Sequence, residues 1–224
     1  MIEIKAKPTP EPTLRRLPKY LNVLTALKER NVLEVSSTLI ANELGLDPTQ
    51  VRKDIQYTGI EGRPKTGFFT DELINAIRTF LNWDNTTDAF LVGVGSLGTA
   101  MLGYQQFKLH GINFVAAFDN DPDKVGQYIH GISVLPIEKL TNLTSRMKVH
   151  IGVLTVPASA AQAIANMMIE GGIQAIWNFA PTHIKVPDNI IVENAQLTHS
   201  LAVLTRKLSE YNFNLGDNLY DYAI

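Results

Sequence analysis

Cysteine is absent from the 224-residue sequence, which excludes disulfide bonds, thiolate metal sites and a cysteine nucleophile. The sequence also lacks an apolar run of the roughly 18 residues that a membrane-spanning helix needs. The N-terminal segment has lysines at positions 5 and 7 and prolines at 8, 10 and 12, so it lacks the apolar core of a signal peptide. We therefore expect a cytoplasmic protein that has no membrane partner.

A strong excess of charge of either sign is missing too, since 20 Lys and Arg stand against 22 Asp and Glu. The distribution is uneven, however. Residues 1–82 hold 12 basic and 10 acidic side chains, and residues 83–224 hold 8 and 12. A slightly basic first third that precedes an acidic remainder indicates two modules with different partners.

Three glycines spaced G-x-G-x-x-G follow an apolar run at residues 89–92, and a helical pattern begins directly after them. This is the strand–turn–helix setting of a dinucleotide-binding loop. The first glycine permits a tight turn, the second lets a pyrophosphate approach the backbone, and the third lets the helix pack on the strand. Free N–H groups at the helix start favour the phosphate charge. The expected contacts are Gly93, Val94, Gly95, Ser96, Leu97 and Gly98.

A second apolar strand, at residues 113–118, ends in Asp119, about 20 residues after the last glycine as the motif requires. A carboxylate at this point accepts hydrogen bonds from both hydroxyls of the adenosine ribose and repels a 2′-phosphate. We therefore expect NADH or NAD⁺ as the ligand, with Asp119 and Asn120 beside it. A glycine turn that binds nothing is the alternative.

The first 82 residues have the pattern of a small helical domain. Pro18 is the expected first residue of a helix that ends near Arg30, and Ser36 or Ser37 caps a second helix that Gly45 ends. A third helix over residues 49–57 has Asp47 as its N-cap and Pro48 at its first position. Thr70 begins a further helix over residues 73–81. Two short helices joined by a glycine-containing turn predict a helix-turn-helix.

The third helix has the side-chain types that reach bases and phosphates from the major groove. A glycine-rich loop at residues 59–69 follows it and fits a hairpin wing. The alternative is a helical domain whose charges are merely solvated. Taken together, the expected DNA contacts are Ser37, Gln50, Arg52, Lys53, Gln56, Tyr57, Arg63 and Lys65.

From residue 89 onward, about six strands alternate with helices, which predicts a doubly wound parallel sheet of the Rossmann type. Ligands bind beyond the carboxyl ends of such strands, so further cofactor contacts are expected at Thr155, Val156, Pro157, Asn178, Phe179 and Ala180. The last helix carries Leu197, Leu201, Leu204, Leu208 and Tyr211 at 4-3-4-3 spacing. Because the sheet is complete by then, we expect this apolar seam to pack on a second subunit, with packing on the chain's own N-terminal domain as the alternative.

Several stretches together resemble the bacterial redox-sensing transcriptional repressors of the Rex family. They are RLPKY at 16–20, VSS at 35–37, QVRKD at 50–54, LVGVGSLG at 91–98, AAFDNDPDKVG at 116–126, LTVPA at 154–158, NFAP at 178–181 and VEN at 192–194. The resemblance implies a homodimer with an N-terminal winged helix, a C-terminal Rossmann domain and a last helix exchanged between subunits. It also implies binding to an A/T-rich inverted repeat when NADH is scarce, and release when NADH occupies the Rossmann sites.

The sequence departs from the family pattern at three places: QYTG at 56–59 after the third helix, RPK at 63–65 in the wing, and AQL at 195–197. Some members have an aspartate where Gln196 stands, and it pairs across the dimer with the tyrosine that matches Tyr104. Gln196 can hydrogen-bond to Tyr104 but cannot form a charged pair with it. The resemblance thereby adds Tyr104 to the cofactor-linked residues.

Two other functions are considered. An NAD-dependent oxidoreductase with an accessory helical domain would need an acid–base group beside the nicotinamide, and His183 is the only plausible candidate. A Rossmann domain that binds coenzyme A is disfavoured by Asp119. We expect no catalytic residue and no metal site. The predicted organisation is a flexible arm at 1–13, a winged-helix domain at 14–82, a Rossmann domain at 83–195, an exchanged helix at 196–213 and a tail at 214–224.

Overall fold

The computed structural model describes residues 8–64, 66–195 and 197–220 of the chain. They form two compact units. One unit runs to Thr86 and takes in Leu109–Gly111, and the other holds the remaining residues from Thr87 onward. No helix in the described ranges has both the length and the apolar character to cross a bilayer.

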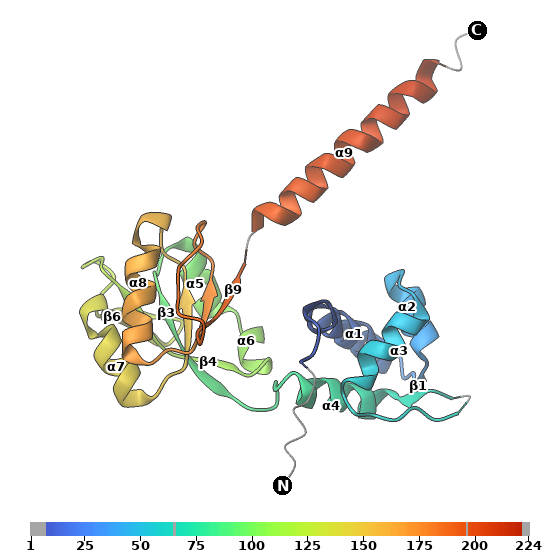
Figure 1. The fold of residues 1–224 in the computed structure, drawn as a ribbon, viewed down its shortest axis with the longest axis horizontal. Helices are drawn as coiled ribbons and strands as arrows, with labels where there is room; N and C mark the ends of the chain where they lie inside the picture. The colour runs from blue at the N-terminus through green and yellow to red at the C-terminus, as the bar shows by residue number, and fades with distance from the viewer. Residues whose placement is uncertain (1–7, 65, 196, 221–224) are drawn as a thin grey trace. The chain divides into compact units, whose positions relative to one another are not determined.

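The first unit is a helical domain with a small two-stranded sheet (Figure 1). A buried cluster that includes Leu17, Tyr20, Ile40, Val51 and Leu73 joins its helices. Strands β1 and β2 pair antiparallel, with Val35 opposite Phe68. The elements are α1 (Glu11–Glu29), β1 (Glu34–Val35), α2 (Ser37–Leu44), α3 (Pro48–Gln56), β2 (Phe68–Phe69) and α4 (Thr70–Phe80).

The residues that begin and end α2, and those that begin α3, are the ones predicted from the sequence. The Ser36 hydroxyl accepts a hydrogen bond from the Leu39 N–H at 3.1 Å, and Gly45 closes α2 with φ +62°. The Asp47 carboxylate accepts from the N–H groups of Thr49 and Gln50 at 2.7 and 3.1 Å. The helix-turn-helix prediction is confirmed by these caps together with the packing of α2 on α3.

Two expectations about helix starts are wrong. Helix α1 begins at Glu11, so residues 11–13, assigned to a flexible arm, are helical and Pro18 lies inside the helix. Leu17 and Tyr20 on either side of Pro18 are fully buried, and this packing outweighs the hydrogen bond that proline removes. Thr70 does not cap α4, because Phe69 is the N-cap residue and the Thr70 hydroxyl donates to the Val32 carbonyl at 2.6 Å.

The second unit is a Rossmann-type α/β fold. Its sheet has the order β5-β6-β4-β3-β7-β8-β9, and all pairs except β5–β6 are parallel. Without β5 this is the 3-2-1-4-5-6 order of dinucleotide-binding domains. The strands are β3 (Thr87–Val92), β4 (Ile112–Asp119), β5 (Tyr128–Ile129), β6 (Ile132–Pro136), β7 (Ile151–Leu154), β8 (Ala175–Asn178) and β9 (Ile191–Asn194).

Alternation along β3 divides the core between the two faces of the sheet. Phe90 and Val92 pack with the cluster under α7 and α8, whereas Ala89 and Leu91 pack with the cluster under α5. Figure 1 shows these helices on opposite faces. The helical elements are α5 (Ser96–Gly103), α6 (Gln106–Leu109), the 3-10 turn η1 (Ile137–Lys139), α7 (Leu140–Met147), α8 (Ala158–Gly171) and α9 (Leu197–Tyr220).

Three details of the second unit differ from the sequence interpretation. The helix expected to continue to Leu109 is interrupted at Tyr104, whose backbone is extended. Strand β5 was not foreseen, and His150, expected inside a strand, is exposed just before β7. Helix α9 runs to Tyr220, so most of the expected tail is helical.

Candidate dinucleotide site and nucleic-acid interface

In the turn between β3 and α5, each of the three glycines has a surrounding that fits the role the motif assigns to it: a tight turn, open space for a pyrophosphate, or close packing of the helix. Gly93 has φ +99°, and a Cβ there would lie 2.8 Å from the Thr155 carbonyl oxygen. A Cβ on Gly98 would collide with the Gly93 carbonyl oxygen. Around Gly95 nothing lies within 4 Å of the position that a Cβ would occupy. The turn is therefore closed against its own sheet at Gly93 and Gly98 and open toward solvent at Gly95.

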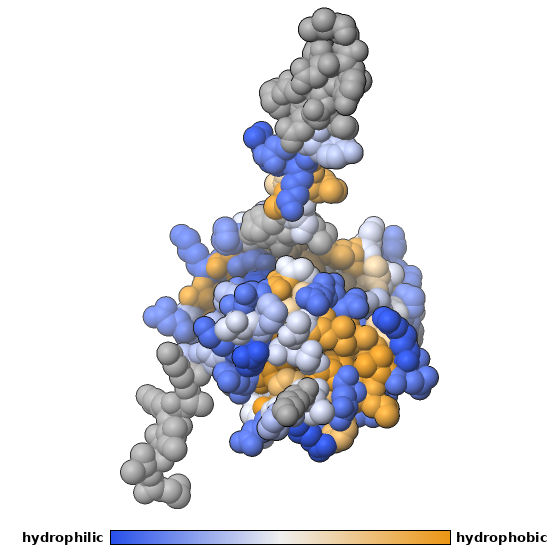
Figure 2. Space-filling view, turned by 90° about the vertical axis from the view of Figure 1, so that its right-hand side faces the viewer, coloured by the Kyte–Doolittle hydropathy of each residue, from blue (hydrophilic) through white to orange (hydrophobic). Residues whose placement is uncertain are grey.

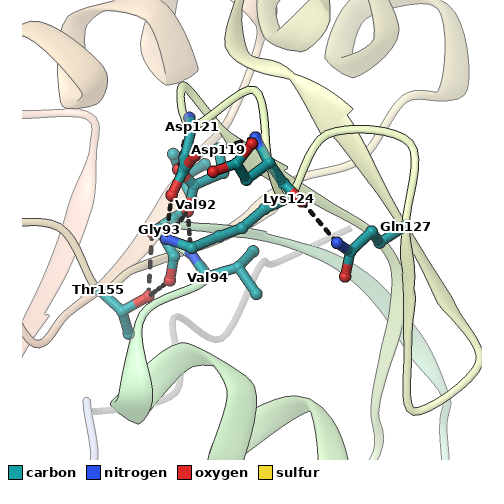
Figure 3. Close-up of polar contacts among 9 residues, drawn as sticks. Val92, Gly93, Val94, Asp119, Asp121, Lys124, Gln127 and Thr155 are labelled. Atoms are coloured by element: carbon teal, nitrogen blue, oxygen red, sulfur yellow. Dashed lines mark hydrogen bonds and ion pairs between the residues drawn. The ribbon is translucent and has the colours of Figure 1, made fainter.

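Asp119 ends β4 and faces this turn (Figure 3). One carboxylate oxygen accepts the Val94 N–H at 2.7 Å and lies 3.5 Å from the Lys124 ammonium, and the other accepts the Asp121 N–H at 2.9 Å. Asp119 as a whole is 7 % exposed. The acid predicted to bind a ribose thus also holds the backbone of the glycine-rich turn.

Thr155 fastens the same turn to β7. Its hydroxyl lies 2.7 Å from the Gly93 carbonyl oxygen and 3.0 Å from the Val92 carbonyl oxygen (Figure 3). The carboxyl ends of β3, β4 and β7 therefore meet around Gly93, at the reversal of strand order where doubly wound sheets bind ligands.

A cavity of about 390 Å³ opens at this point. Of the predicted cofactor residues, it brings together Gly93, Asp119, Asn120, Val156 and Pro157. Ile137, Ile164 and Met167 add an apolar wall that the sequence interpretation missed. An acidic edge beside an apolar wall matches the ribose and the adenine ring of a dinucleotide. Gly95, Ser96 and Leu97 lie exposed at the start of α5.

The remaining predicted cofactor residues lie elsewhere. Asn178 is buried, donates to Thr182 and Asn194 at 2.8 Å and accepts the Ala180 N–H, so it shapes the loop after β8. Phe179 packs on Trp177, with ring centroids 4.7 Å apart. Tyr104 is 56 % exposed and lines a separate cavity with His130. Gln196, the expected partner of Tyr104, lies outside the described residues.

A groove of about 630 Å³ marks the candidate DNA-binding face of the first unit. It lies between the start of α2, helix α3 and the loop before β2, and it brings together Ser37, Arg52, Gln56 and Arg63. Ser37 is itself buried, which leaves the other three to offer polar groups. Lys53 on α3 and Tyr57 directly after that helix are exposed but lie outside the groove. Lys65 belongs to the residues that the structure does not describe.

The loop before β2 is closed at its base. The backbones of Arg63 and Gly67 form an antiparallel bridge with hydrogen bonds of 2.6 and 3.1 Å. The Arg63 guanidinium lies over the Phe69 ring, 3.8 Å from its centroid. Gly67 has φ +92°, and a Cβ there would collide with the Val35 carbonyl oxygen. This geometry is that of a short wing folded against β1.

Asp54 is a buried acid of α3 to which the sequence interpretation gave no role. Its carboxylate is 1 % exposed and accepts hydrogen bonds from Arg16, Tyr20, Thr13 and Gln50. Burial alone would raise its pKa, but the bonds from Arg16, Tyr20 and Thr13 outweigh it, so the pKa of Asp54 lies below its ordinary value. The available signal was its position three residues after Val51, on the core-facing stripe of α3.

The candidate catalytic residue and possible metal ligands were also located in the structure. His183 is exposed on the loop after β8. Among the described residues, no three His, Cys, Asp or Glu side chains gather in a way that would hold a metal ion.

Comparisons with known proteins agree with this division of the chain. Residues 9–55 match a family described as putative DNA-binding protein N-terminus, and residues 84–182 match one described as CoA binding domain. A redox-sensing transcriptional repressor Rex from Treponema denticola is 44 % identical over 89 % of this chain and 95 % of its own length.

Solved structures of the Rex-family repressor RSP are similar over almost the whole chain at 32 % identity. One, in complex with NAD⁺ and operator DNA, has a TM-score of 0.86 and covers 98 % of this chain and 100 % of its own. Another, in complex with NADH, has a TM-score of 0.85 and covers 94 % and 99 %. The identity and coverage of these matches show that the chain belongs to the Rex family of redox-sensing transcriptional repressors.

Proposed function

We propose that this protein represses transcription as a homodimer that binds operator DNA and releases it when NADH occupies its Rossmann units. The observation that carries the cofactor part is the turn between β3 and α5. Its backbone is held by Asp119 and Thr155, and the space at Gly95 is left open. A bound dinucleotide would supply the pyrophosphate that this open backbone accommodates and the ribose diol that a carboxylate prefers.

The ligand choice follows from Asp119. A free ribose diol offers two donors to a carboxylate, whereas a phosphorylated ribose, as in NADP or coenzyme A, would place a negative charge near a buried acid. The family matched at residues 84–182 is described as a CoA binding domain, whereas two of the RSP structures contain NAD⁺ or NADH. These observations support NAD(H) for this chain.

The DNA-binding part rests on α3 and the wing. Arg52 and Arg63 line one groove, with Lys53 exposed beside it. Cations on a capped, exposed helix fit the phosphates that flank a major groove. The matched relatives are transcriptional repressors, which sets aside the oxidoreductase alternative.

The homodimer is supported by α9. The side chains of Leu201, Val203, Leu204, Leu208 and Tyr211 are each more than half exposed, and Figure 2 shows apolar side chains on the described turns of this helix. A two-fold partner that covered this face would also place two copies of α3 to match an inverted repeat. NADH would then act by binding one arrangement of the dimer better than the other.

The test is a DNA-binding titration of the full chain at several NADH to NAD⁺ ratios and constant total dinucleotide. We expect tight binding in NAD⁺ and a loss of at least tenfold in affinity when NADH predominates. Equal operator affinity at all ratios would overturn the proposed function. NADPH at the same concentrations is the matched control and should have no effect.

A further inference from the structure

The carboxylate of Asp54 is saturated by donors from two helices. One oxygen accepts from Arg16 Nε and Tyr20 Oη, both at 2.6 Å, and the other accepts from Thr13 Oγ1 and Arg16 Nη2, both at 2.9 Å. Thr13, Arg16 and Tyr20 all belong to α1. The orientation of α3 relative to α1 is therefore fixed by an ionised acid that has no freedom to rotate.

Gln50 contacts the same carboxylate from the first turn of α3. Its Nε2 lies 2.9 Å from the Asp54 oxygen that also accepts from Thr13 and Arg16. An ionised carboxylate only accepts hydrogen bonds, so the Gln50 amide must turn its NH₂ group toward Asp54. The second N–H of that group and the carbonyl oxygen Oε1 are left as one donor and one acceptor side by side.

This edge of Gln50 has the hydrogen-bonding pattern that complements adenine. In the major groove adenine offers the N6 amino donor and the N7 acceptor, whereas guanine offers two acceptors. Gln50 is half-buried and is the third residue of α3, and recognition helices contact base edges from their N-terminal turn. A glutamine free to turn would also serve other bases, but this one is held in one orientation.

We propose that Gln50 reads an adenine in each half-site through N6 and N7, and that Asp54 is the positioning residue that fixes its amide. This inference rests on the proposed operator binding and adds the identity of one base to it. Arg52 and Lys53 follow Gln50 on α3. We assign to them contacts with DNA phosphates, which raise affinity for any sequence, and we assign to Gln50 the contact that distinguishes one base from another.

The experiment starts from double-stranded DNA with a randomised centre, enriched on the full-length wild-type protein in NAD⁺. Each A·T pair of the enriched site is then replaced in turn by the other three pairs, and adenine is also replaced by 7-deazaadenine, which lacks N7. Affinities of wild type, Gln50→Ala and Asp54→Asn are compared on these duplexes. Thermal denaturation shows that each variant is folded.

We expect one adenine per half-site at which wild type loses roughly tenfold to hundredfold on replacement by another base and several-fold on 7-deaza substitution. Gln50→Ala should become indifferent to both changes at that position and keep its other preferences. Asp54→Asn should reduce the preference for adenine over guanine there, because an amide at position 54 lets Gln50 turn over. Tyr20→Phe removes a donor to Asp54 without removing the acceptor that Gln50 uses, so it should lower stability and keep the adenine preference.

A uniform loss of affinity for all duplexes in Gln50→Ala would place Gln50 at the phosphates and overturn the inference, even though operator binding stands. If Asp54→Asn does not fold, the Gln50→Ala and 7-deazaadenine comparison still decides whether Gln50 reads this base. If wild type enriches no sequence, the proposed function itself fails, and the two failures are thereby distinguished.

Discussion

The Asp119 carboxylate accepts a hydrogen bond of 2.7 Å from the Val94 N–H, across 25 residues of sequence. The acid at the end of β4 therefore shapes the turn at the end of β3, in addition to the ribose contact proposed for it. A single side chain of this kind would couple two parts of the proposed dinucleotide site, since the proposal assigns the pyrophosphate to the turn and the ribose to the acid.

Asp119→Ala should weaken NADH binding severalfold or more, because it removes the ribose acceptor and releases Val94. Isothermal calorimetry measures the dissociation constant directly. Asp188→Ala, at an exposed acid of the same unit, is the control and should bind like wild type. An unchanged affinity in Asp119→Ala would remove the cofactor assignment.

Alanine at Gly95 should reduce NADH affinity, whereas alanine at Gly98 should reduce the stability of the fold. Gly95→Ala fills open space, so the melting temperature should stay close to wild type while NADH affinity falls at least tenfold. Gly98→Ala forces a Cβ against the Gly93 carbonyl oxygen and should cost about 1–3 kcal/mol of folding free energy. Thermal denaturation and calorimetry on the same samples separate the two. Normal NADH binding by a folded Gly95→Ala would exclude a pyrophosphate at this turn.

Arg52→Ala or Lys53→Ala should weaken operator binding and flatten its dependence on salt. Each lost phosphate contact reduces the slope of log K against log salt by about 0.9. Gel-shift titrations at four salt concentrations give this slope, with Lys139→Ala in η1 as the matched control. A slope equal to that of wild type would refute the assignment of these residues to DNA phosphates.

Deleting residues from Ser200 onward should convert dimers to monomers, because it removes the exposed apolar face of α9. The milder pair Leu201→Asp and Leu208→Asp should act in the same direction by placing charge on that face. Light scattering after size exclusion measures the mass. Dimers that persist in both variants would contradict the exchange of this helix.

The contact between Trp83 and His110 should depend on pH. Their ring centroids lie 4.2 Å apart, and burial, followed by the charge of Arg78, lowers the pKa of His110. The unfolded chain then binds the proton more readily than the folded one, so the stability from this contact is complete above pH about 6.5 and falls below it. Urea unfolding followed by tryptophan fluorescence at pH 7.5 and 5.5 should show the loss. In His110→Phe this pH dependence should be absent.

Much of the fold could be predicted because its local signals agree with its packing. Asp47 with Pro48 starts α3 and Gly45 ends α2 by backbone chemistry that needs no distant partner. The glycine spacing and Asp119 predicted a shared site, and the structure brings these motifs together because both fall at strand ends that the parallel order makes neighbours.

The features that escaped prediction depend on contacts between distant segments. Pro18 indicated a helix start, but the buried side chains of Leu17 and Tyr20 hold this segment in the middle of α1. Asp54 was given no role, because its partners Arg16 and Tyr20 belong to α1 and are 38 and 34 residues away in the sequence. The apolar wall of the candidate dinucleotide cavity comes from η1 and α8, and no local pattern links those elements to the glycine-rich turn.

Gly67 restricts which positions of the wing can accept another side chain. A side chain there would press on the Val35 carbonyl and, through it, on the segment that leads into the Ser36 cap of α2. Variation at this glycine would disturb the whole helix-turn-helix, whereas Pro64 is exposed in the loop that the Arg63–Gly67 bridge closes. A substitution at Pro64 would therefore change the surface of the wing and leave the close approach of Gly67 to the Val35 carbonyl in place.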